Sequence, residues 1–521
     1  MHLFSRLHST RTIIYAGCLF TLLYVIFSDG FYHPDEYYQI LEFAHMRLFG
    51  TPPSDLPWEY QTMMRPGFQP LIAYGFGKLL TSIHFYDPFI LQTLLRLLSG
   101  TLSVVALLVF CRAIRPFFQT ASEKRWYLIL GFFVWFMAYF HVRFSSETLS
   151  GNLLLLLVSM LMFFRQKERR HPFLWGLWMG LLAGAAFIVR FQVGFALLGF
   201  GLWLLVYLRK VSLLSGLGLG VVAMLGVGTA ADRWLYGIWT CTPLNYLHEN
   251  ILQGHIDSFG IDPWWYYLAY IPLEGGILFG ILLLAATLIF IWKNLKHPLP
   301  WMLIPFLITH QAIGHKEVRF LFPILAFAPY ILLAASRYVP IRILHSKGAR
   351  IIGWTAVSLN VLIIVFNLTI RNTDIAFYHQ MRELCPSNKP KAILNLKKDK
   401  TFYSYYETTL FPRAVSGHYF LPAGTQRLLF DTLPDMERSA QAFTEDAQIC
   451  ILEAAVFFIL SEDLQLDEHF SVPLQKIDWN PYPQWIVRYF NFNDWVGLSV
   501  RRKNLYQVQV VLPGEAGPKN S

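Results

Sequence analysis

The sequence predicts an all-α polytopic membrane protein with about eleven transmembrane helices, followed by a small extracytoplasmic α/β domain at its C-terminal end. Hydrophobic residues make up 55% of the 521 positions, and the mean hydropathy is +0.41. Charged residues make up only 15%, whereas a soluble protein of this size carries about a quarter. Continuous apolar runs recur over the first 370 positions, and a run of about 17 residues can cross a hydrocarbon core as a helix.

The loops between the apolar runs predict how the chain is threaded. With a cytoplasmic N-terminus, every short loop on that side carries Lys or Arg, as the positive-inside rule requires. Of the 16 acidic residues before position 371, 14 then lie on the opposite face. The net charge of +10 therefore indicates orientation in a membrane, and no nucleic-acid partner is expected. The expected spans are 12–28, 89–110, 126–141, 148–164, 173–189, 191–208, 211–230, 266–292, 299–313, 319–336 and 351–369.

This threading divides the chain into two domains. Residues 1–370 form the transmembrane domain, with a first outer loop at 29–88, and residues 371–521 form the extracytoplasmic domain. The second domain holds 16 Lys or Arg against 17 Asp or Glu, so charge alone does not suit it to lipid headgroups. We expect it to recognise an acceptor or to shield a site. Its β-prone runs are 448–452, 485–490 and 506–512.

The first outer loop opens on two adjacent acids, Asp35 and Glu36, directly after Pro34. Proline suits the first turn of a helix, and acids suit its positive end. Helical spacing would then place Asp35, Gln39 and Glu42 near one face. The simpler interpretation is that the two acids cap and solvate this helix. The chemical interpretation is a general base at a membrane edge, where burial raises the pKa of a carboxyl group.

Cations mark two further outer positions. Arg190 sits between two apolar runs, where an ionisable residue is a functional candidate, although it could also be an anchor that reaches toward the interface. His315, Lys316 and Arg319 surround Glu317, an arrangement that could hold a phosphate. The structural alternative is a simple ion pair between Glu317 and Arg319. If this segment is helical, Lys316 and Arg319 can face one ligand.

Two more outer segments supply charged residues. The hairpin at 141–148 contains Glu147 and Arg143, of which Arg143 is best explained as a solvated residue. The segment at 232–250 begins with Asp232 and Arg233. Carboxylates and guanidinium groups on one membrane face suit a reaction on a lipid-linked phosphate, in which cations hold the leaving phosphate. No nucleotide-binding motif and no metal-ligand spacing competes with this interpretation, so neither a cofactor nor a metal is expected.

Four outer segments carry family motifs: His33-Pro34-Asp35-Glu36-Tyr37-Tyr38-Gln39, Phe144 to Leu149, Asp232-Arg233-Trp234-Leu235-Tyr236-Gly237-Ile238-Trp239, and His315-Lys316-Glu317-Val318-Arg319-Phe320-Leu321-Phe322-Pro323. They resemble glycosyltransferase family 22, the mannosyltransferases of the GT-C superfamily. The resemblance is best to the branch that adds mannose to glycosylphosphatidylinositol (GPI) precursors. It covers residues 29–330 and fails over 371–521. Family members commonly show Arg-Pro-Thr where this chain has Arg190-Phe191-Gln192.

The resemblance implies a GT-C catalytic domain over residues 1–370 that transfers mannose with inversion on the non-cytoplasmic face. The donor would be a polyprenyl- or dolichyl-phosphate mannose, and the acceptor a lipid-linked, GPI-like glycan. By analogy a first-loop acid is the base, and neither a metal nor another cofactor is needed. The expected roles are catalysis for Asp35 and Glu36, phosphate binding for Lys316, Arg319 and Arg190, and substrate binding for His33, Gln39, Glu147, Asp232, Arg233, His315 and Glu317.

Two alternative functions stay open. One is a GT-C enzyme that moves a different lipid-linked sugar, and the other is a non-enzymatic carrier of lipid-linked glycans. In each case the partners are membrane lipids and glycolipids. The membrane would be that of the endoplasmic reticulum in a eukaryote, or the plasma (inner) membrane in a bacterium.

Overall fold

The computed structural model describes residues 9–28, 30–33, 35–53, 56–166 and 170–370, together with five strands and a few single positions in the last 150 residues. The chain divides into two compact units, Met1–Ser28 with Glu59–Leu368, and Asp29–Trp58 with Thr369–Ser521. The second unit therefore groups the start of the first outer loop with the C-terminal residues.

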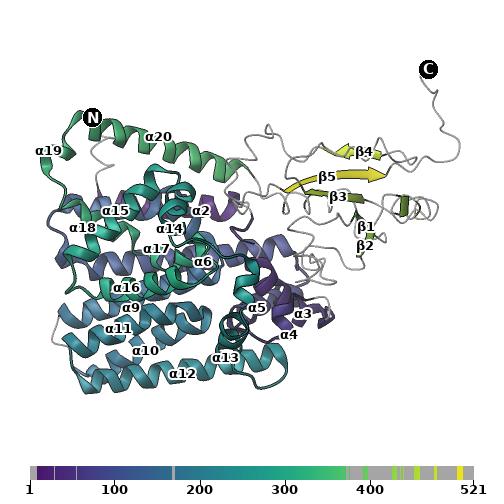
Figure 1. Ribbon diagram of the computed structural model, residues 1–521, viewed down its shortest axis with the longest axis horizontal. Coiled ribbons are helices and arrows are strands. Elements are labelled where there is room, and N and C mark those ends of the chain that lie inside the picture. Colours follow the sequence, from purple (N-terminus) through teal and green to yellow (C-terminus); the bar gives the residue numbers. More distant parts are fainter. Residues whose placement is uncertain are drawn as a thin grey trace. The chain divides into compact units, whose positions relative to one another are not determined.

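The described helices are α2 Thr10–Phe27, η1 Tyr37–Leu41, α3 Glu42–Phe49, α4 Trp58–Gln61, α5 Phe68–Ser82, α6 Pro88–Ala113, η3 Arg115–Phe117, α7 Ala121–Phe133, α8 Trp135–Val142, α9 Ser146–Gln166, α10 Pro172–Val189, η4 Phe191–Val193, α11 Gly194–Tyr207, α12 Val211–Tyr236, α13 Thr242–Leu247, η5 His248–Leu252, η6 His255–Phe259, α14 Tyr266–Glu274, α15 Leu278–Lys293, α16 Pro298–Ala312, η7 Val318–Leu321, α17 Phe322–Leu325, α18 Ala328–Ser336, α19 Ile341–Leu344 and α20 Lys347–Thr369 (Figure 1).

The helices of the first unit are those of a multi-pass membrane protein. Among the described residues, six helices are long and apolar enough to cross a membrane: α2, α6, α9, α10, α12 and α20. Two bent pairs raise the number to eight if each is one span. These are Ala121–Phe133 with Trp135–Val142, bent by 61°, and Val318–Leu325 with Ala328–Ser336, bent by 74°. The total of eleven spans stays a prediction.

Two of the expected spans are interrupted for identifiable reasons. At the break between α7 and α8, the Asn360 side chain accepts from the Trp135 N–H at 2.8 Å and donates to the Phe133 carbonyl at 2.8 Å. One amide thus satisfies two backbone groups that the break exposes, which a membrane interior requires. The expected span at 266–292 is two helices, because Gly276 and Ile277 have positive φ values of 74° and 54° and turn the chain.

Helices α10 and α12 lie side by side along their length (Figure 1). A Cβ added at Gly176, Gly180 or Gly220 would come within 2.0, 2.1 or 2.3 Å of a backbone oxygen of the facing helix. The partners advance in the same direction on both helices, so α10 and α12 are parallel. Small residues at four-residue spacing allow backbones to approach this closely in membranes. The seam sets the position of α10, whose C-terminal cap is Arg190.

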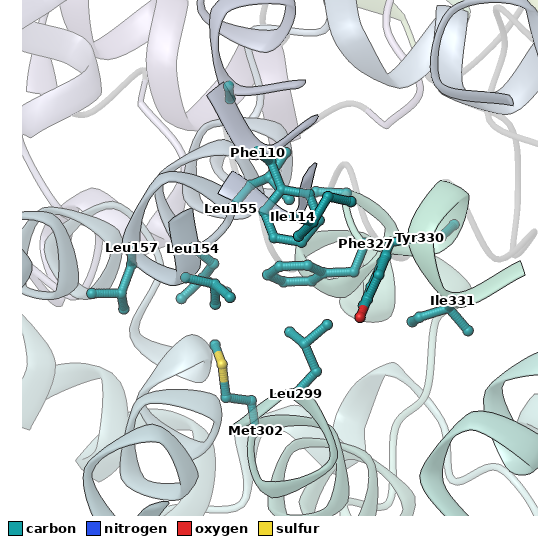
Figure 2. Packing of buried hydrophobic residues seen from close by; sticks show 14 of the residues in the cluster. Phe110, Ile114, Leu154, Leu155, Leu157, Leu299, Met302, Phe327, Tyr330 and Ile331 are labelled. Atoms are coloured by element: carbon teal, nitrogen blue, oxygen red, sulfur yellow. The ribbon is translucent and has the colours of Figure 1, made fainter. Parts of the chain in front are cut away.

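A second packing centre joins α6, α9, α16 and α18 (Figure 2). The Phe110 ring meets the rings of Phe327 and Tyr330 edge-on, with centroids 5.8 and 5.7 Å apart. Leu299 and Met302 of α16 lie below these rings in the same view. Because lipid is as apolar as these side chains, close packing and not water exclusion holds the helices together here.

Polar contacts tie the basic loops to one end of the helices. The Arg337 Nη2 atom is 2.7 Å from Glu123 Oε2, and the Trp203 Nε1 donates to the Lys296 carbonyl at 3.0 Å. The Arg165 guanidinium lies 5.2 Å from the Trp203 ring centre. These contacts join segments expected to be cytoplasmic; which end of the bundle faces the cytoplasm stays a prediction.

The described strands of the second unit form one mixed sheet in the order β2-β1-β3-β5-β4. β1 is parallel to β2 and to β3, whereas β5 is antiparallel to β3 and β4. Two expected β-prone runs, 448–452 and 506–512, overlap β3 and β5, and the run at 485–490 lies outside the described residues. The α/β class of this part stays a prediction. The strands are β1 Lys391–Leu396, β2 Thr425–Phe430, β3 Ile451–Phe457, β4 Leu474–Ile477 and β5 Arg501–Val508.

Gly180→Ala should lower the thermal stability of the purified protein in detergent, because the new methyl group meets the Leu217 carbonyl oxygen. Overpacking of this kind costs about 1–3 kcal/mol. Gly218→Ala is the matched control on α12, because nothing lies within 4 Å of its added Cβ. It should leave the melting temperature unchanged or slightly raised. Equal melting temperatures for the two variants would contradict the glycine seam.

Candidate functional site

The site begins where α9 starts and α10 ends. Glu147 lies in the first turn of α9, and Arg190 follows the last residue of α10. The Arg190 Nη1 atom is 2.7 Å from Glu147 Oε1 and donates to Ser146 Oγ at 3.0 Å. Both charged side chains are only 6% exposed. A buried ion pair therefore joins the two helix ends, which are 43 positions apart in the sequence.

A second guanidinium reaches the same carboxylate. Arg319, in the 3₁₀ helix η7, places Nη1 3.5 Å from Glu147 Oε1. Its Nε and Nη2 atoms donate to the two oxygens of Glu317, the Nη2 bond measuring 3.1 Å. His315 Nε2 is 3.0 Å from Glu317 Oε1. The expected structural pairing of Glu317 with Arg319 is thus present, and it belongs to a chain of contacts that runs from Arg190 to His315.

The Lys316 side chain binds backbone carbonyls of neighbouring loop residues. It does not share a helix face with Arg319. Its ammonium donates to the backbone carbonyls of Asp262 at 3.0 Å and Gly314 at 3.2 Å. Its backbone N–H donates to Asp262 Oδ2 at 2.8 Å. The described helical segment begins only at Val318, so the helical spacing that would direct Lys316 and Arg319 at one ligand is absent. Asp262 was not among the predicted site residues, because nothing in its local sequence indicates a partner 54 positions away.

Arg190 has donor capacity that the described residues leave unused. Its Nε and Nη2 atoms are buried and make no hydrogen bond within the described part of the chain. The Phe320 ring lies beside it, 5.7 Å from its Cζ atom, and 5.2 Å from that of Arg319. Leaving buried charged donors unsatisfied is costly, so this geometry indicates a place for an acceptor from outside the described residues.

Asp232 anchors the end of the first outer loop. Its Oδ1 accepts from the Gly67 N–H at 2.7 Å, and its Oδ2 accepts from the Thr242 hydroxyl at 2.6 Å. The Tyr236 hydroxyl, one turn later, donates to the Arg65 carbonyl at 2.6 Å. Arg233 is exposed, with its guanidinium 5.9 Å from the Trp239 ring centre. Asp232 thus positions Gly67 and Thr242, and neither Asp232 nor Arg233 takes part in the ion pairs of Arg190 among the described residues.

Arg143 corrects the expectation of a solvated hairpin residue. It is 3% exposed, its guanidinium lies 4.0 Å from the Tyr139 ring centre, and its Nη2 donates to the Ser28 carbonyl at 3.2 Å. Arg96 donates to the same carbonyl at 2.8 Å. Two cations at the last carbonyl of a helix satisfy its unpaired group and its negative end. Arg143 and Arg96 therefore secure the end of α2, where the first outer loop begins.

The acids of that loop form a compact turn. The Glu36 Oε1 accepts from the Tyr32 N–H at 3.1 Å, and the Asp35 N–H donates to His33 Nδ1 at 3.2 Å. A helical turn starts at Asp35 as expected, whereas Pro34 lies outside the described residues. Gln39 belongs to the π-helix η1. Its i→i+5 bonds change the spacing of side chains, so the α-helical rule that placed Asp35, Gln39 and Glu42 on one face does not apply.

No group of three or more His, Cys, Asp or Glu side chains among the described residues is placed to hold a metal ion. The chemistry that the described site supports is recognition of an anion by guanidinium groups. Carboxylates orient these groups, and an aromatic ring partly excludes water from them. Guanidinium suits this task because its planar fork can hold two oxygens of one phosphate.

Glu147→Gln should destabilise the protein strongly, because it leaves two buried guanidinium groups without their shared carboxylate. Breaking a buried ion pair on one side costs about 3–5 kcal/mol. Thermal unfolding in detergent would measure this loss. Glu249→Gln is the control, because its partners His248 and His255 have half-exposed side chains and such pairs contribute little. A Glu147→Gln protein as stable as the control would show that the shared carboxylate is dispensable.

The amino-acid sequence is similar to those of known mannosyltransferases. The model of the Alg9-like mannosyltransferase family matches residues 12–408. Mannosyltransferase APTG1 of Arabidopsis thaliana is 25% identical over 329 residues, which is 62% of this chain and 58% of that protein. GPI mannosyltransferase 3 of Drosophila melanogaster is 27% identical over 318 residues, 58% of this chain and 52% of that protein. The chain thus spans little more than half the length of these relatives.

One solved structure shares the fold. ArnT from Cupriavidus metallidurans, in a crystal structure bound to undecaprenyl phosphate, is 13% identical with a TM-score of 0.56. The match covers 98% of this chain and 99% of that one. Identity this low shows likeness of fold alone.

Proposed function

We propose that this chain, which belongs to the Alg9-like mannosyltransferase family, transfers mannose from a polyprenyl- or dolichyl-phosphate-mannose donor to a lipid-linked, GPI-like glycan, with inversion. The resemblance to glycosyltransferase family 22 that the motifs predicted is confirmed by this membership. The observation that carries the proposal is the buried Arg190 guanidinium, which keeps two N–H donors unused among the described residues. The names of the GPI mannosyltransferase relatives support the choice of acceptor.

The donor phosphate is assigned to Arg190, with Arg319 in support. As the sugar–phosphate bond breaks, negative charge builds on the phosphate oxygens, and fixed cations with little water around them stabilise it. Arg319 uses Nε and Nη2 on Glu317, and the Lys316 ammonium is held by backbone carbonyls. Arg190 thus has the more direct role, and Lys316 acts by charge at longer range. That ArnT, which shares the fold, binds undecaprenyl phosphate is consistent with a lipid phosphate here.

The general base is assigned to Asp35, with Glu36 as the alternative. Inverting transfer needs a carboxylate that accepts the proton of the acceptor hydroxyl. The Glu36 carboxylate already accepts from the Tyr32 backbone and so stabilises the turn. The Asp35 side chain is 28% exposed, and its Oδ1 lies 3.3 Å from His33 Nδ1. In this proposal His33 and Gln39 contact the acceptor or the sugar.

Other expected substrate-binding residues take supporting roles in this proposal. Glu147, Glu317 and His315 orient the two guanidinium groups, and Asp232 fixes the returning end of the first loop. Arg233 is exposed and could meet the acceptor. The site faces away from the cytoplasm, in the endoplasmic reticulum membrane of a eukaryote or the plasma (inner) membrane of a bacterium.

A reconstitution assay tests the proposal. Purified protein in lipid vesicles receives polyprenyl-phosphate mannose and a GPI-precursor glycolipid, and the transfer of mannose is followed by mass. We expect a mannosylated glycolipid and free polyprenyl phosphate in equal amounts. Transfer only from a donor with a different sugar would favour the alternative transferase. Binding of both lipids without turnover would favour a carrier.

Asp35→Asn should reduce the turnover number in this assay by about a hundredfold or more, because the amide cannot accept the proton. Folding should be unaffected. Asp87→Asn is the matched control, since Asp87 caps α6 through the Phe89 and Ile90 N–H groups and asparagine caps equally well. Near-normal turnover by Asp35→Asn would move the base to another residue.

Arg190→Lys should weaken binding of polyprenyl phosphate and reduce turnover by about tenfold or more, because lysine keeps the charge and the Glu147 pair but loses the planar fork. Equilibrium binding of the lipid phosphate to vesicle-bound protein measures the effect. Arg112→Lys, at an exposed position of the predicted cytoplasmic side, should match wild type in both assays. Wild-type lipid binding by Arg190→Lys would remove Arg190 from the phosphate site.

A further inference from the structure

His310 lies near the C-terminal end of α16, and the hydrogen-bond partner of its Nδ1 atom shows which ring nitrogen carries the proton. The side chain is 1% exposed, and its Nδ1 lies 2.7 Å from the Phe306 carbonyl oxygen. A carbonyl oxygen only accepts hydrogen bonds, so Nδ1 carries the proton. In the neutral ring, Nε2 is then an acceptor. This Nε2 is buried and makes no hydrogen bond within the described part of the chain.

His310 and Arg190 both lie near the ring of Phe320. The His310 ring centre is 6.4 Å from that of Phe320, and the Arg190 Cζ is 5.7 Å from the same ring centre. Around Phe320 there are thus one buried acceptor and two buried donors that make no hydrogen bond with any described residue.

We infer that Arg190 and His310 form one subsite, in which Arg190 holds a phosphate oxygen of the donor and His310 Nε2 accepts a hydrogen bond from a hydroxyl of the attached sugar. A phosphate diester alone offers only acceptors, so it satisfies Arg190 and leaves Nε2 unpaired. A glycosyl phosphate offers an anionic oxygen and hydroxyl donors side by side. This inference rests on the proposed function and names His310 as a residue that contacts the sugar.

The subsite makes a prediction about sugar specificity. A site whose buried acceptor requires a hydroxyl rejects an analogue that lacks it, because the acceptor is left unpaired. Mannose donors that each lack one hydroxyl would reveal which hydroxyl is bound. We expect one of these deoxy donors to lose about 10- to 100-fold in kcat/KM with the wild-type protein, beyond the losses of the others.

His310→Asn is the informative variant. The asparagine amide can still donate to the Phe306 carbonyl from the Nδ1 position, whereas the acceptor at the Nε2 position is gone. The variant should lose activity on the full mannose donor, and the selective deoxy penalty should disappear while the other penalties remain. His310→Gln is the complement, because its amide can place an acceptor near the Nε2 position. It should retain part of the selectivity. It also keeps the subsite testable if the His310→Asn protein fails to fold.

Equilibrium binding separates this inference from the proposed function. Wild type should bind polyprenyl-phosphate mannose at least about tenfold more tightly than polyprenyl phosphate, and His310→Asn should lose that difference while binding the bare lipid phosphate normally. Arg190→Lys should weaken binding of both lipids. If wild type binds the mannosylated lipid in this way but transfers nothing, the proposed reaction fails and the subsite stands. Unchanged deoxy penalties in a folded His310→Asn protein, or equal weakening of both lipids, would overturn the subsite.

Discussion

The carboxylate of Glu147 lies within reach of two buried guanidinium groups, and the arrangement of the site depends on it. One oxygen serves Arg190 at 2.7 Å and Arg319 at 3.5 Å, so the start of α9, the end of α10 and the helix η7 meet at one atom. Buried ion pairs contribute little net stability because desolvation offsets the attraction, but they can specify one arrangement over its alternatives. Here Nη1 of Arg190 is bound to Glu147 and Ser146, which leaves Nε and Nη2 for a ligand.

Two kinds of contact, close packing at glycines and hydrogen bonds to the backbone, position the helices and the loop around this carboxylate. The glycines of α10 and α12 bring the two backbones together, and these helices end at Arg190 and near Asp232. Hydrogen bonds then fix both places where the first outer loop meets the first unit. Arg96 and Arg143 bind the carbonyl of Ser28 before the loop, and Asp232 binds the N–H of Gly67 within it.

The cations Lys316, Arg319 and Arg190 carry the same charge but make different contacts. Sequence reasoning gave Lys316 and Arg319 the main role in phosphate binding, because they are close in the chain. In the structure Lys316 is committed to carbonyls and Arg319 largely to Glu317, whereas Arg190 keeps two buried donors without a partner among the described residues. The capacity of a cation to bind a ligand thus depends on what its remaining donors already contact.

The sequence by itself determined the membrane class, the long apolar helices and the family. These properties are local, because a helix that crosses lipid must satisfy its own backbone over about 20 apolar residues, and motifs are read residue by residue. Only the tertiary structure decided that Arg143 is buried, that Asp262 engages Lys316, and that His310 and Arg190 both lie near the Phe320 ring. Such pairings join residues tens of positions apart, and which donor or acceptor stays unpaired depends on side-chain geometry that local sequence does not specify.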